Sequence, residues 1–270
     1  MEKSTIIGLI LGFISLIVGM ILKGANPVAI VQNPAAIMII LVGTAAAVTI
    51  AFPGSDLQKL PKLFKLLFTG QKLMPKPEII RLFMDWASVT RREGLLALES
   101  KVEEIDDAFL RNGMRMIIDG NDQDFVRDVL MEEIHATEDR HKAGALMFTQ
   151  AGTYAPTLGV LGAVVGLVAA LANLSDMDKL AHSIAAAFIA TLLGIFTGYV
   201  LWHPFANKLK RLSKKEMEIK LMMVEGLLSI QSGVSTIAIS QKLAVFLSPT
   251  ERAEQSKKEA AQDGEKAQTA

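Results

Sequence analysis

The chain has 270 residues, 51% of them hydrophobic, and its 28 basic residues balance its 28 acidic residues. This hydrophobic share is high for a soluble domain, and the absence of a basic excess argues against a protein that binds nucleic-acid phosphates. The chain has no cysteine, which excludes disulfides, thiol nucleophiles and cysteine-ligated metals. The composition therefore favours a membrane protein.

Four stretches contain no Asp, Glu, Lys or Arg: 4–22, 24–55, 143–175 and 180–207. Each is long enough for a membrane-spanning helix, which needs about 20 apolar residues. The first is too long for the apolar core of a signal peptide and precedes no small-residue cleavage site, so we expect it to remain in the membrane. The predicted fold is an all-α integral membrane protein, with four transmembrane helices and a large helical cytoplasmic domain between the second and the third.

The predicted organisation has five segments. They are transmembrane helices 1 and 2 (1–53), a cytoplasmic helical domain (54–142), transmembrane helices 3 and 4 (143–204), a cytoplasmic helical extension (205–248) and a disordered tail (249–270). Basic residues gather in the central domain and after the last crossing, whereas each loop between paired crossings holds one. The positive-inside rule therefore places the central domain and both termini in the cytoplasm.

The central and C-terminal segments show helical periodicity and no clear period of two, so we expect no strand. Residues 57–67 place Leu57, Leu60, Phe64 and Leu67 on one stripe, which predicts an amphipathic helix at the membrane surface with Pro61 in its first turn. Further helices are predicted at 77–93, 95–103, 108–119, 122–142, 206–230 and 235–246. The residues after 249 are small, polar and charged, which is typical of disorder.

Glycines recur at helical spacing in the last two crossings, at Gly159, Gly162 and Gly166 and again at Gly194 and Gly198. Small residues allow helices to approach closely in lipid, although this spacing is common and by itself indicates only packing. Hydroxyl groups accompany the glycines in both crossings. We therefore expect this helix pair to face protein or water.

No crossing contains a carboxylate, although a proton-translocating helix usually carries one. His182 and His203 fall near opposite membrane surfaces, where an interfacial role is more common than a proton relay. If the protein conducts an ion, the titrating group must come from a partner. No phosphate-binding, dinucleotide-binding or hydrolase motif is present, so we expect neither an enzyme nor a cofactor or metal site.

The central domain contains the charged segment TRREGLLALE at 90–99. On a continuous helix Arg91 and Glu99 would lie about two turns apart within one broad half of the surface, and Gly94 could interrupt that helix. Spacing alone favours an ordinary solvated face. The same applies to the carboxylates at Glu103, Glu104, Asp106 and Asp107, which lack the spacing of a metal site.

Four motifs resemble the MotA family of flagellar stator subunits, in the MotA/TolQ/ExbB proton channel family. They are TRREGLLALE (90–99), AGTYAPTLGVLGAVVGL (151–167), AFIATLLGIFTGYVLWHPFANKLK (187–210) and EGLLSIQSG (225–233). The resemblance implies a subunit of the bacterial inner membrane, in contact with lipid and not with nucleic acid. It also implies a ring, pentameric in the family, around two copies of MotB, which supplies the protonated aspartate and the peptidoglycan anchor.

The resemblance assigns roles to individual residues. Arg91, with Arg92 beside it, and Glu99 match the positions that contact the rotor protein FliG. Pro156 and Pro204 match the prolines that couple conformation to ion flow. Sodium-driven relatives carry hydroxyl groups at the positions of Ala163, Ala190 and Thr191, and the two alanines here favour protons.

Two other functions fit part of the sequence: an energiser of another membrane process, and a passive scaffold or transporter. An ExbB/TolQ-type energiser of another membrane process would usually have three crossings, so the four crossings here count against it. A passive helical scaffold or transporter would need no MotB-like partner and would leave the charged segment at 90–99 unexplained.

Overall fold

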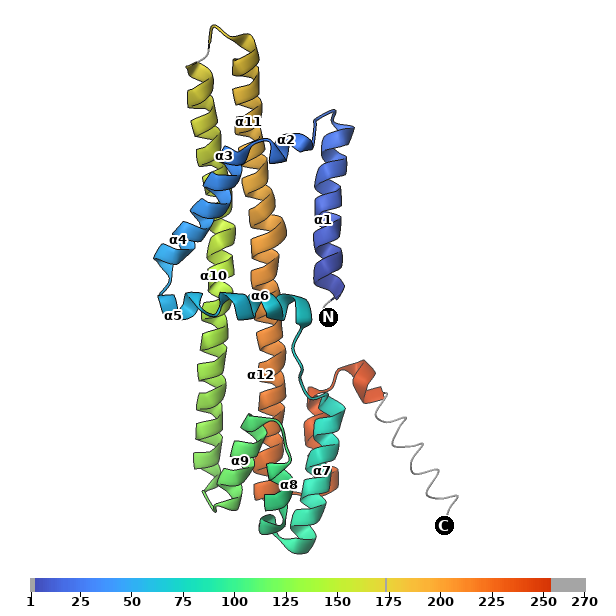
Figure 1. The fold of residues 1–270 in the computed structure, drawn as a ribbon. Coiled ribbons are helices and arrows are strands. Elements are labelled where there is room, and N and C mark those ends of the chain that lie inside the picture. Colours follow the sequence, from blue (N-terminus) through green and yellow to red (C-terminus); the bar gives the residue numbers. More distant parts are fainter. Residues whose placement is uncertain (1–2, 173, 254–270) are drawn as a thin grey trace. The chain divides into compact units, whose positions relative to one another are not determined.

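The computed structural model describes residues 3–172 and 174–253, and all elements within these ranges are helical (Figure 1). The chain divides into two compact units. The first, which we call the membrane unit, comprises Met1–Gln71 and Asp139–Leu212. The second, the polar unit, comprises Lys72–Glu138 and Ser213–Ala270. The helices α10 (Gln123–Leu171) and α12 (His203–Gln231) each contribute residues to both units.

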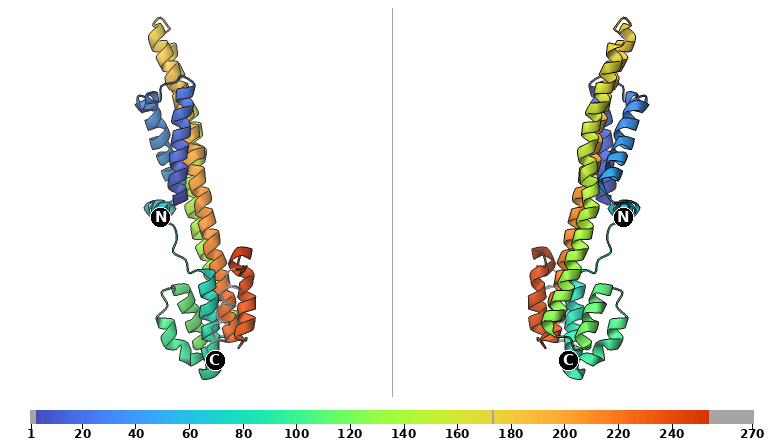
Figure 2. Two further views of the ribbon diagram at one scale, coloured as in Figure 1. Left: turned by 90° about the vertical axis from the view of Figure 1, so that its right-hand side faces the viewer. Right: turned by 90° about the vertical axis from the view of Figure 1, so that its left-hand side faces the viewer.

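The membrane unit contains the four predicted crossings, which confirms the predicted fold class. Helices at Lys3–Leu22, Pro34–Ala51, Gln123–Leu171 and Met177–Gln231 are long and apolar enough to cross a membrane. The first is α1 (Lys3–Leu22), whose ribbon lies beside the fourth crossing (Figure 2). The rings of Phe13 in α1 and Phe196 in the fourth crossing lie 5.2 Å apart, centroid to centroid. The third is the apolar part of α10.

The second crossing is assembled from three consecutive helical segments after the short α2 (Val28–Val31). These are α3 (Pro34–Ile37), the π-helical η1 (Met38–Val42) and α4 (Gly43–Ala51). The Asn33 side chain caps α3 by accepting a hydrogen bond from the Ala36 N–H at 3.2 Å. Its amide also donates to the Ala186 carbonyl at 2.9 Å. Asn33 thus ties the start of the second crossing to the fourth.

Two predicted helix boundaries are absent because the helices run through them. The predicted helix at 122–142 and the third crossing form the single helix α10. The fourth crossing, α11 (Met177–Phe196), likewise continues through the π-helical η3 (Thr197–Trp202) into α12. No glycine or proline lies between 122 and 143. Near residue 143 the side chains change from polar to apolar, which changes the solvent that the helix prefers from water to lipid. This change does not interrupt the backbone hydrogen bonds of the helix, since no proline or glycine is present.

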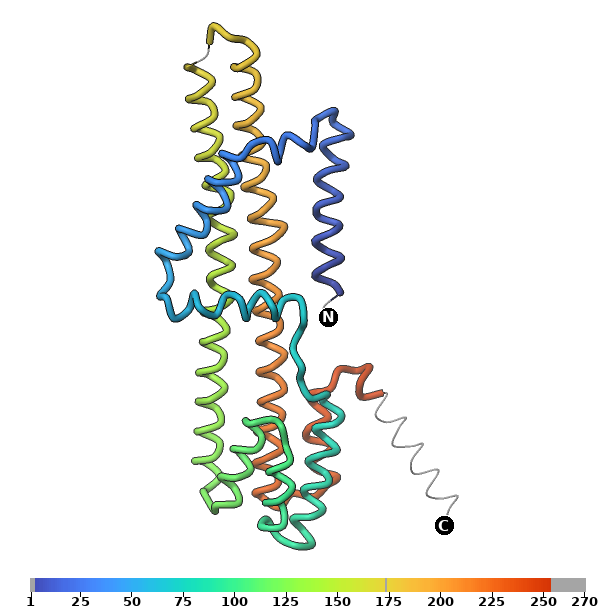
Figure 3. The backbone as a smooth tube through the Cα atoms, viewed as in Figure 1, coloured from blue at the N-terminus to red at the C-terminus, as the bar shows by residue number. Residues whose placement is uncertain are grey.

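The amphipathic segment forms α5 (Gly54–Leu57) and α6 (Leu60–Thr69), with Pro61 in the first turn of α6 as predicted. Figures 1 and 3 show α6 running across α10 and the start of α12. Leu67 is fully buried, and the Phe64 ring lies 5.0 Å from that of Phe148 in α10. The lysines of α6 are exposed on the other side. The helix therefore presents its apolar stripe to the crossings.

In the polar unit, short helices pack around the parts of α10 and α12 that belong to this unit. They are α7 (Lys76–Glu93), the 3-10 helix η2 (Leu95–Leu98), α8 (Glu99–Glu103), α9 (Ala108–Ile118), α13 (Thr236–Leu243) and the 3-10 helix η4 (Ala244–Phe246). Large side chains such as Phe83, Leu110 and Leu227 are fully buried in its core. Gly94 ends α7 with φ +84°, and Gly120 follows α9 with φ +80°. Only glycine adopts these φ values readily, so the chain turns at both glycines, between helices that were predicted to be separate.

The chain after η4 forms a further helical turn at 249–253. The Ser248 hydroxyl accepts from the Glu251 N–H at 3.3 Å, and the Glu251 carboxylate accepts from the Ser248 N–H at 2.8 Å. This reciprocal pair is a capping box, and the Ser248 N–H lowers the pKa of Glu251. The remainder of the predicted disordered tail, 254–270, lies outside the described residues.

Candidate functional site

Small residues form the contact between α10 and the fourth crossing in the membrane unit. A Cβ atom placed on Gly194 would lie 2.7 Å from the Ala155 carbonyl oxygen and 2.8 Å from the Gly159 Cα. Because these neighbours are backbone atoms, the helices are too close for any larger side chain there. We call this contact the small-residue interface, formed by Gly152, Ala155, Pro156, Gly159, Gly162 and Gly166 of α10 with Ala187, Ala190, Gly194, Gly198 and His203.

Pro156 lies in this interface against η3. A Cβ atom on Gly198 would lie 2.7 Å from the Pro156 Cγ and 2.9 Å from the Gly152 carbonyl oxygen. Proline has no N–H, so the Gly152 carbonyl, four residues earlier, does not receive its usual helical hydrogen bond. Single π-helical turns such as η3 are often found at functional sites. Both helices therefore depart from regular α-helical hydrogen bonding at the same level of the interface.

Pro204 is exposed and is the second residue of α12, the helix that follows η3 directly. The preceding residue, His203, packs its ring against α10, since a Cβ atom on Gly152 would lie 2.8 Å from its Cγ and Cδ2. The Tyr199 ring lies 5.3 Å from the His203 ring. His203 therefore connects the surroundings of the two prolines. The sequence places His203 near a membrane surface and so predicted only an interfacial role. Its contact with Gly152 could not be predicted, because the sequence does not tell which residues of the two helices meet.

Pro204 also borders a cavity of about 410 Å³ between α1 and the fourth crossing. At one side of this cavity the Lys208 ammonium donates hydrogen bonds to the hydroxyls of Ser4, at 3.3 Å, and Thr5. The buried Thr5 hydroxyl donates to the Leu67 carbonyl at 2.9 Å, which joins α1 to α6. Pro204 consequently has free volume beside it, in contrast to Pro156, which contacts Gly198 directly.

The three positions proposed for ion choice differ in their surroundings. Ala190 is only 1% exposed and packs against Gly162, where an added Cβ atom would lie 3.1 Å from its methyl group. Ala163 and Thr191 are partly exposed, and the Thr191 hydroxyl donates to the Ala187 carbonyl at 3.4 Å. Ala190 is therefore part of helix packing within one chain. Its small size is explained by that contact as well as by the absence of a sodium ligand.

The candidate rotor surface surrounds the turn at Gly94. Arg91, Arg92 and Glu99 are exposed, and their side chains form no hydrogen bond or ion pair with residues 3–172 and 174–253. The two arginines occupy the last turn of α7, where the helix dipole favours positive charge. Gly94 ends that helix, so Arg91 and Glu99 do not share a continuous helix. Leu96, 72% exposed, lies in η2, between Gly94 and Glu99.

Two of the carboxylates that follow this turn, Glu103 and Asp107, have structural partners. Asp107 caps α9 by accepting from the Leu110 N–H at 3.0 Å. Glu103 is held by Arg115, whose Nε donates to it at 3.0 Å, and this hydrogen bond lowers the pKa of Glu103. Among the described residues no cluster of three or more His, Asp or Glu could hold a metal ion. Capping and pairing therefore explain Asp107 and Glu103, two of the four carboxylates in this run.

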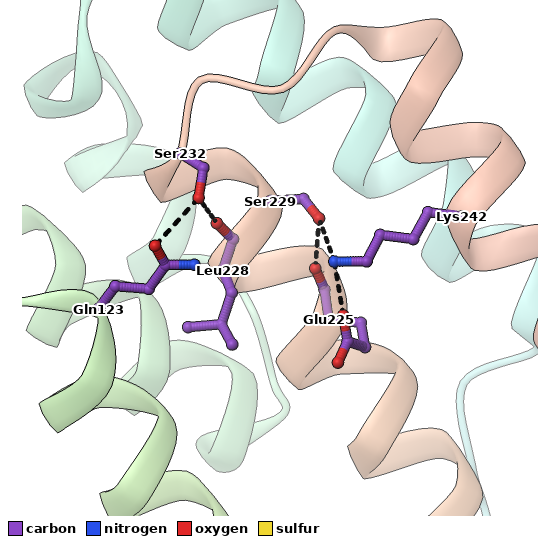
Figure 4. A network of polar contacts seen from close by, with 6 residues as sticks. All are labelled: Gln123, Glu225, Leu228, Ser229, Ser232 and Lys242. Atoms are coloured by element: carbon purple, nitrogen blue, oxygen red, sulfur yellow. Dashed lines mark hydrogen bonds and ion pairs between the residues drawn. The ribbon is translucent and has the colours of Figure 1, made fainter.

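The segment at 225–233 holds the polar unit together at the end of α12 (Figure 4). The Lys242 ammonium lies 2.6 Å from the Glu225 carboxylate and donates to the Ser229 hydroxyl at 3.3 Å, which links α13 to α12. The Ser232 hydroxyl donates to Gln123 of α10 at 3.2 Å. The polar residues of this segment thus join three helices.

These features define a multi-pass helical membrane protein whose third and fourth crossings pack through small residues and Pro156, and whose four charge-free stretches contain no carboxylate. Residues 101–222 match the model of the MotA/TolQ/ExbB proton channel family. Motility protein A of Bacillus subtilis is 55% identical over 266 residues, 98% of each chain. The chain belongs to the MotA/TolQ/ExbB proton channel family.

Solved structures agree with this assignment. The flagellar MotAB stator complex of Bacillus subtilis contains a chain that is 55% identical and matches with a TM-score of 0.89, covering 94% of this chain and 99% of that one. A chain of the C. jejuni MotAB structure is 32% identical and matches with a TM-score of 0.88, covering 92% of this chain and 97% of that one. The likeness therefore extends over both units.

Proposed function

We propose that the chain is the membrane subunit of a flagellar motor stator, which with MotB forms a proton-conducting channel and converts ion flow into torque. The observation that carries the proposal is the pairing of the closely packed small-residue interface, which contains Pro156, with four charge-free stretches that hold no carboxylate. A proton pathway needs a group that can be protonated, so it must come from a partner helix. A MotB helix with an aspartate meets that need. The subunit acts mechanically and catalyses no covalent reaction.

The proposed assembly follows from the need for a protonatable group on a partner helix. We propose a ring of these subunits, a pentamer as in the family, around MotB in the bacterial inner membrane. Both termini and the polar unit face the cytoplasm, in agreement with the basic residues beside the crossings. MotB anchors the unit to peptidoglycan. Pro156 and Pro204 then transmit the change at the aspartate along α10 and α12, which continue from the membrane unit into the polar unit.

The rotor contact is proposed at Arg91, Arg92 and Glu99. Their charges are exposed and unpaired within the described residues, which leaves them available to an oppositely charged surface on FliG. Exposed complementary charges steer association more than they strengthen it, which suits a contact that must form and break repeatedly. Protons are the favoured ion because Ala163 and Ala190 offer no oxygen ligand.

Deletion of the gene and complementation test the proposal. Cells without the protein should assemble complete flagella but not swim, and the intact gene should restore motility. Arg91→Glu, and more strongly Arg91→Glu with Arg92→Glu, should reduce torque measured on a tethered cell, whereas Arg81→Glu, also exposed on α7, should not. Normal torque in the double variant would exclude this rotor surface. Swimming that followed sodium concentration at fixed pH would contradict the choice of protons.

The alternative is an ExbB/TolQ-type energiser of another membrane process, which belongs to the same family. It predicts normal motility after deletion and a defect elsewhere. A neighbouring gene that encodes one crossing with an aspartate and a peptidoglycan-binding domain would favour the stator.

A further inference from the structure

The short helix α6 has a charged side as well as its apolar stripe. Lys62, Lys65 and Thr69 follow one another at spacings of three and four residues, which places them on one face of the helix. All three are exposed, whereas Leu67 on the opposite side is fully buried. We call the exposed side the cationic face of α6. It is separate from the rotor surface and from the small-residue interface.

The two lysines of this face carry charges that the chain does not neutralise. Their ammonium groups form no hydrogen bond or ion pair with residues 3–172 and 174–253. The neighbouring Lys59 differs, because its ammonium lies 2.7 Å from the Asp56 carboxylate. The sequence of α6, LPKLFKLLFT, contains no acidic residue. Two positive charges therefore lie on one short helix without a counter-charge from the described part of the chain.

The helix α6 lies at the level where two crossings end. Thr5, in the first turn of α1, donates a hydrogen bond to the Leu67 carbonyl at 2.9 Å. The second crossing ends at Ala51, and only Phe52 and Pro53 separate it from α5. Figures 1 and 3 show α6 running across the long helices instead of along them. A helix in this position lies in the interfacial plane of a bilayer, at the depth of the lipid headgroups.

Apolar contacts hold the other side of α6 to the membrane unit. The centroid of the Phe64 ring lies 5.0 Å from that of Phe148 in α10. Leu63 approaches α10 so closely that a Cβ atom placed on Gly144 would lie 3.0 Å from its Cδ1. Protein therefore covers the apolar side of α6, and the cationic face is directed away from that protein.

The charge and the depth of this face together define its partner. A lysine ammonium binds phosphate as a point charge, and the phosphates of glycerolipids lie at the headgroup level. Only anionic lipids give the membrane surface a net negative potential. Each lysine beside such a surface strengthens attachment about fivefold. Two unneutralised lysines at this depth therefore favour anionic over zwitterionic lipid.

A second copy of the chain is a poorer match for this face. On the side of the membrane unit where α6 lies, the acidic residues within the described ranges are Asp56 and Asp139. Each already pairs with a lysine of its own chain: Asp56 with Lys59, and Asp139 with Lys142 at 3.4 Å. The other two lie at 176–178, between the third and fourth crossings. At the level of α6, a neighbouring membrane unit therefore offers no unpaired carboxylate among its described residues.

We propose that the cationic face of α6 binds the headgroups of anionic glycerolipids, with Lys62 and Lys65 contacting their phosphates. The lipid supplies the negative charge that this part of the chain lacks. It also holds the outer side of α6 while the apolar stripe packs on α10. The proposal depends on the membrane location of this unit and not on the stator function, so it also applies if the chain serves another membrane process.

Photolabelling tests the proposal on the full chain reconstituted into proteoliposomes of phosphatidylglycerol and phosphatidylcholine in equal amounts. The probe is either lipid, in parallel samples, with a diazirine on an acyl chain next to the ester, and labelled peptides are mapped by mass spectrometry. Residues 58–69 should be labelled about fivefold more strongly by phosphatidylglycerol than by phosphatidylcholine. The exposed apolar residues Ile10, Leu11 and Ile14 of α1 should be labelled equally by both.

Variants separate the charge from the rest of the helix. Lys62→Gln with Lys65→Gln should reduce the preference for phosphatidylglycerol at 58–69 to less than about twofold, whereas Lys62→Arg with Lys65→Arg keeps the charge and should keep the preference. Lys23→Gln with Lys179→Gln is the matched control. It also removes two exposed lysines of the membrane unit, at the opposite end of the crossings, and should leave the labelling of α6 unchanged. Size-exclusion chromatography confirms that each variant is assembled.

Salt provides a test that needs no variant. Raising the ionic strength from about 0.1 M to about 1 M shortens the Debye length from about 10 Å to about 3 Å, which screens exposed charges. The preference of the wild type for phosphatidylglycerol at 58–69 should therefore fall toward equal labelling by the two lipids. The labelling of α1 should not change.

Three results would overturn the proposal. Equal labelling of 58–69 by the two lipids in the wild type would show that anionic headgroups are not recognised. A preference that persisted in the double glutamine variant, or at high salt, would show that the lysines do not produce it. Carbodiimide cross-linking of Lys62 or Lys65 to a carboxylate of another protein chain, in cell membranes, would show that protein and not lipid covers the cationic face.

Discussion

The small-residue interface and the core of the polar unit hold helices together by different means. In the interface, Gly159 and Gly194 bring two backbones into contact, and a Cβ atom there would meet backbone atoms. In the polar unit, buried side chains such as Phe83, Leu110 and Leu227 fill the space between helices. Lipid gives no hydrophobic driving force for helix association, so close packing replaces it in the membrane. Water provides that force around the polar unit.

The difference has a functional meaning. An interface of small residues has few side chains that interlock, and Pro156 and η3 remove regular hydrogen bonds at the same place. A core of large interlocked side chains resists displacement. We therefore expect the polar unit to move as a rigid body, and we expect the helix contacts within the small-residue interface to rearrange.

The largest effect is expected where a side chain meets the backbone. Gly194→Val should abolish motility, because the added atoms would overlap the Ala155 carbonyl and Gly159, which cannot rotate away. Gly8→Ala is the matched control, since no atom lies within 4 Å of a Cβ placed on that glycine. Swimming on soft agar and the amount of assembled protein in the membrane measure both variants. A motile Gly194→Val strain would contradict the close packing described here.

The next effect concerns the side-chain core. Phe83→Ala should lower the free energy of unfolding of the polar unit by about 3–5 kcal/mol, because the fully buried ring leaves a cavity. Phe125→Ala in the same unit removes a ring that is 48% exposed and should cost about 1 kcal/mol or less. Thermal melting of the purified complex compares them. Equal losses in the two variants would show that burial does not determine stability here.

A smaller effect is expected for the polar network at the end of α12. Lys242→Met removes the partner of Glu225, but both side chains are partly exposed, so the loss should be about 0.5–1 kcal/mol. High salt should reduce the difference between the variant and the wild type, because exposed ion pairs are screened. A loss of several kcal/mol that salt did not alter would indicate a more central role for this network.

The smallest effect is a dependence on pH at the loop before the fourth crossing. The Lys179 N–H donates to the Asp176 carboxylate at 3.1 Å and lowers its pKa in the folded protein. A carboxyl whose folded pKa is lowered stabilises the fold above its unfolded pKa, about 3.9, and loses this contribution as pH falls through the folded value. Asp176→Asn keeps a capping oxygen but does not titrate. From pH 6 to pH 3, its melting temperature should fall slightly less than that of the wild type, and an identical fall would contradict the assignment.

Much of the fold was predictable because single residue types decide it. Charge-free stretches of this length can only be accommodated in lipid or in a large core, and they therefore predicted the number and positions of the four crossings. Gly94 and Gly120 mark helix ends because they adopt positive φ. The capping role of Asp107 was not foreseen, since a run of carboxylates gives no indication of which one faces a helix N-terminus.

The unpredicted features depend on packing between distant segments. The continuity of α10 past 142 has no local signal other than the absence of a breaker. The contact of His203 with Gly152 arises only when the two helices meet. The prolines at 156 and 204 were identified by resemblance. The structure places Pro156 in the small-residue interface and Pro204 beside it, and their coupling role stays a prediction.

The central claim is that this chain forms half of a proton pathway and needs a partner's carboxylate. Proton flux into vesicles loaded with a pH-sensitive dye tests it, with the chain reconstituted alone, with MotB, and with a MotB variant whose transmembrane aspartate is replaced by asparagine. The account predicts flux only with intact MotB. Flux through the chain alone, at the rate found with MotB, would contradict it.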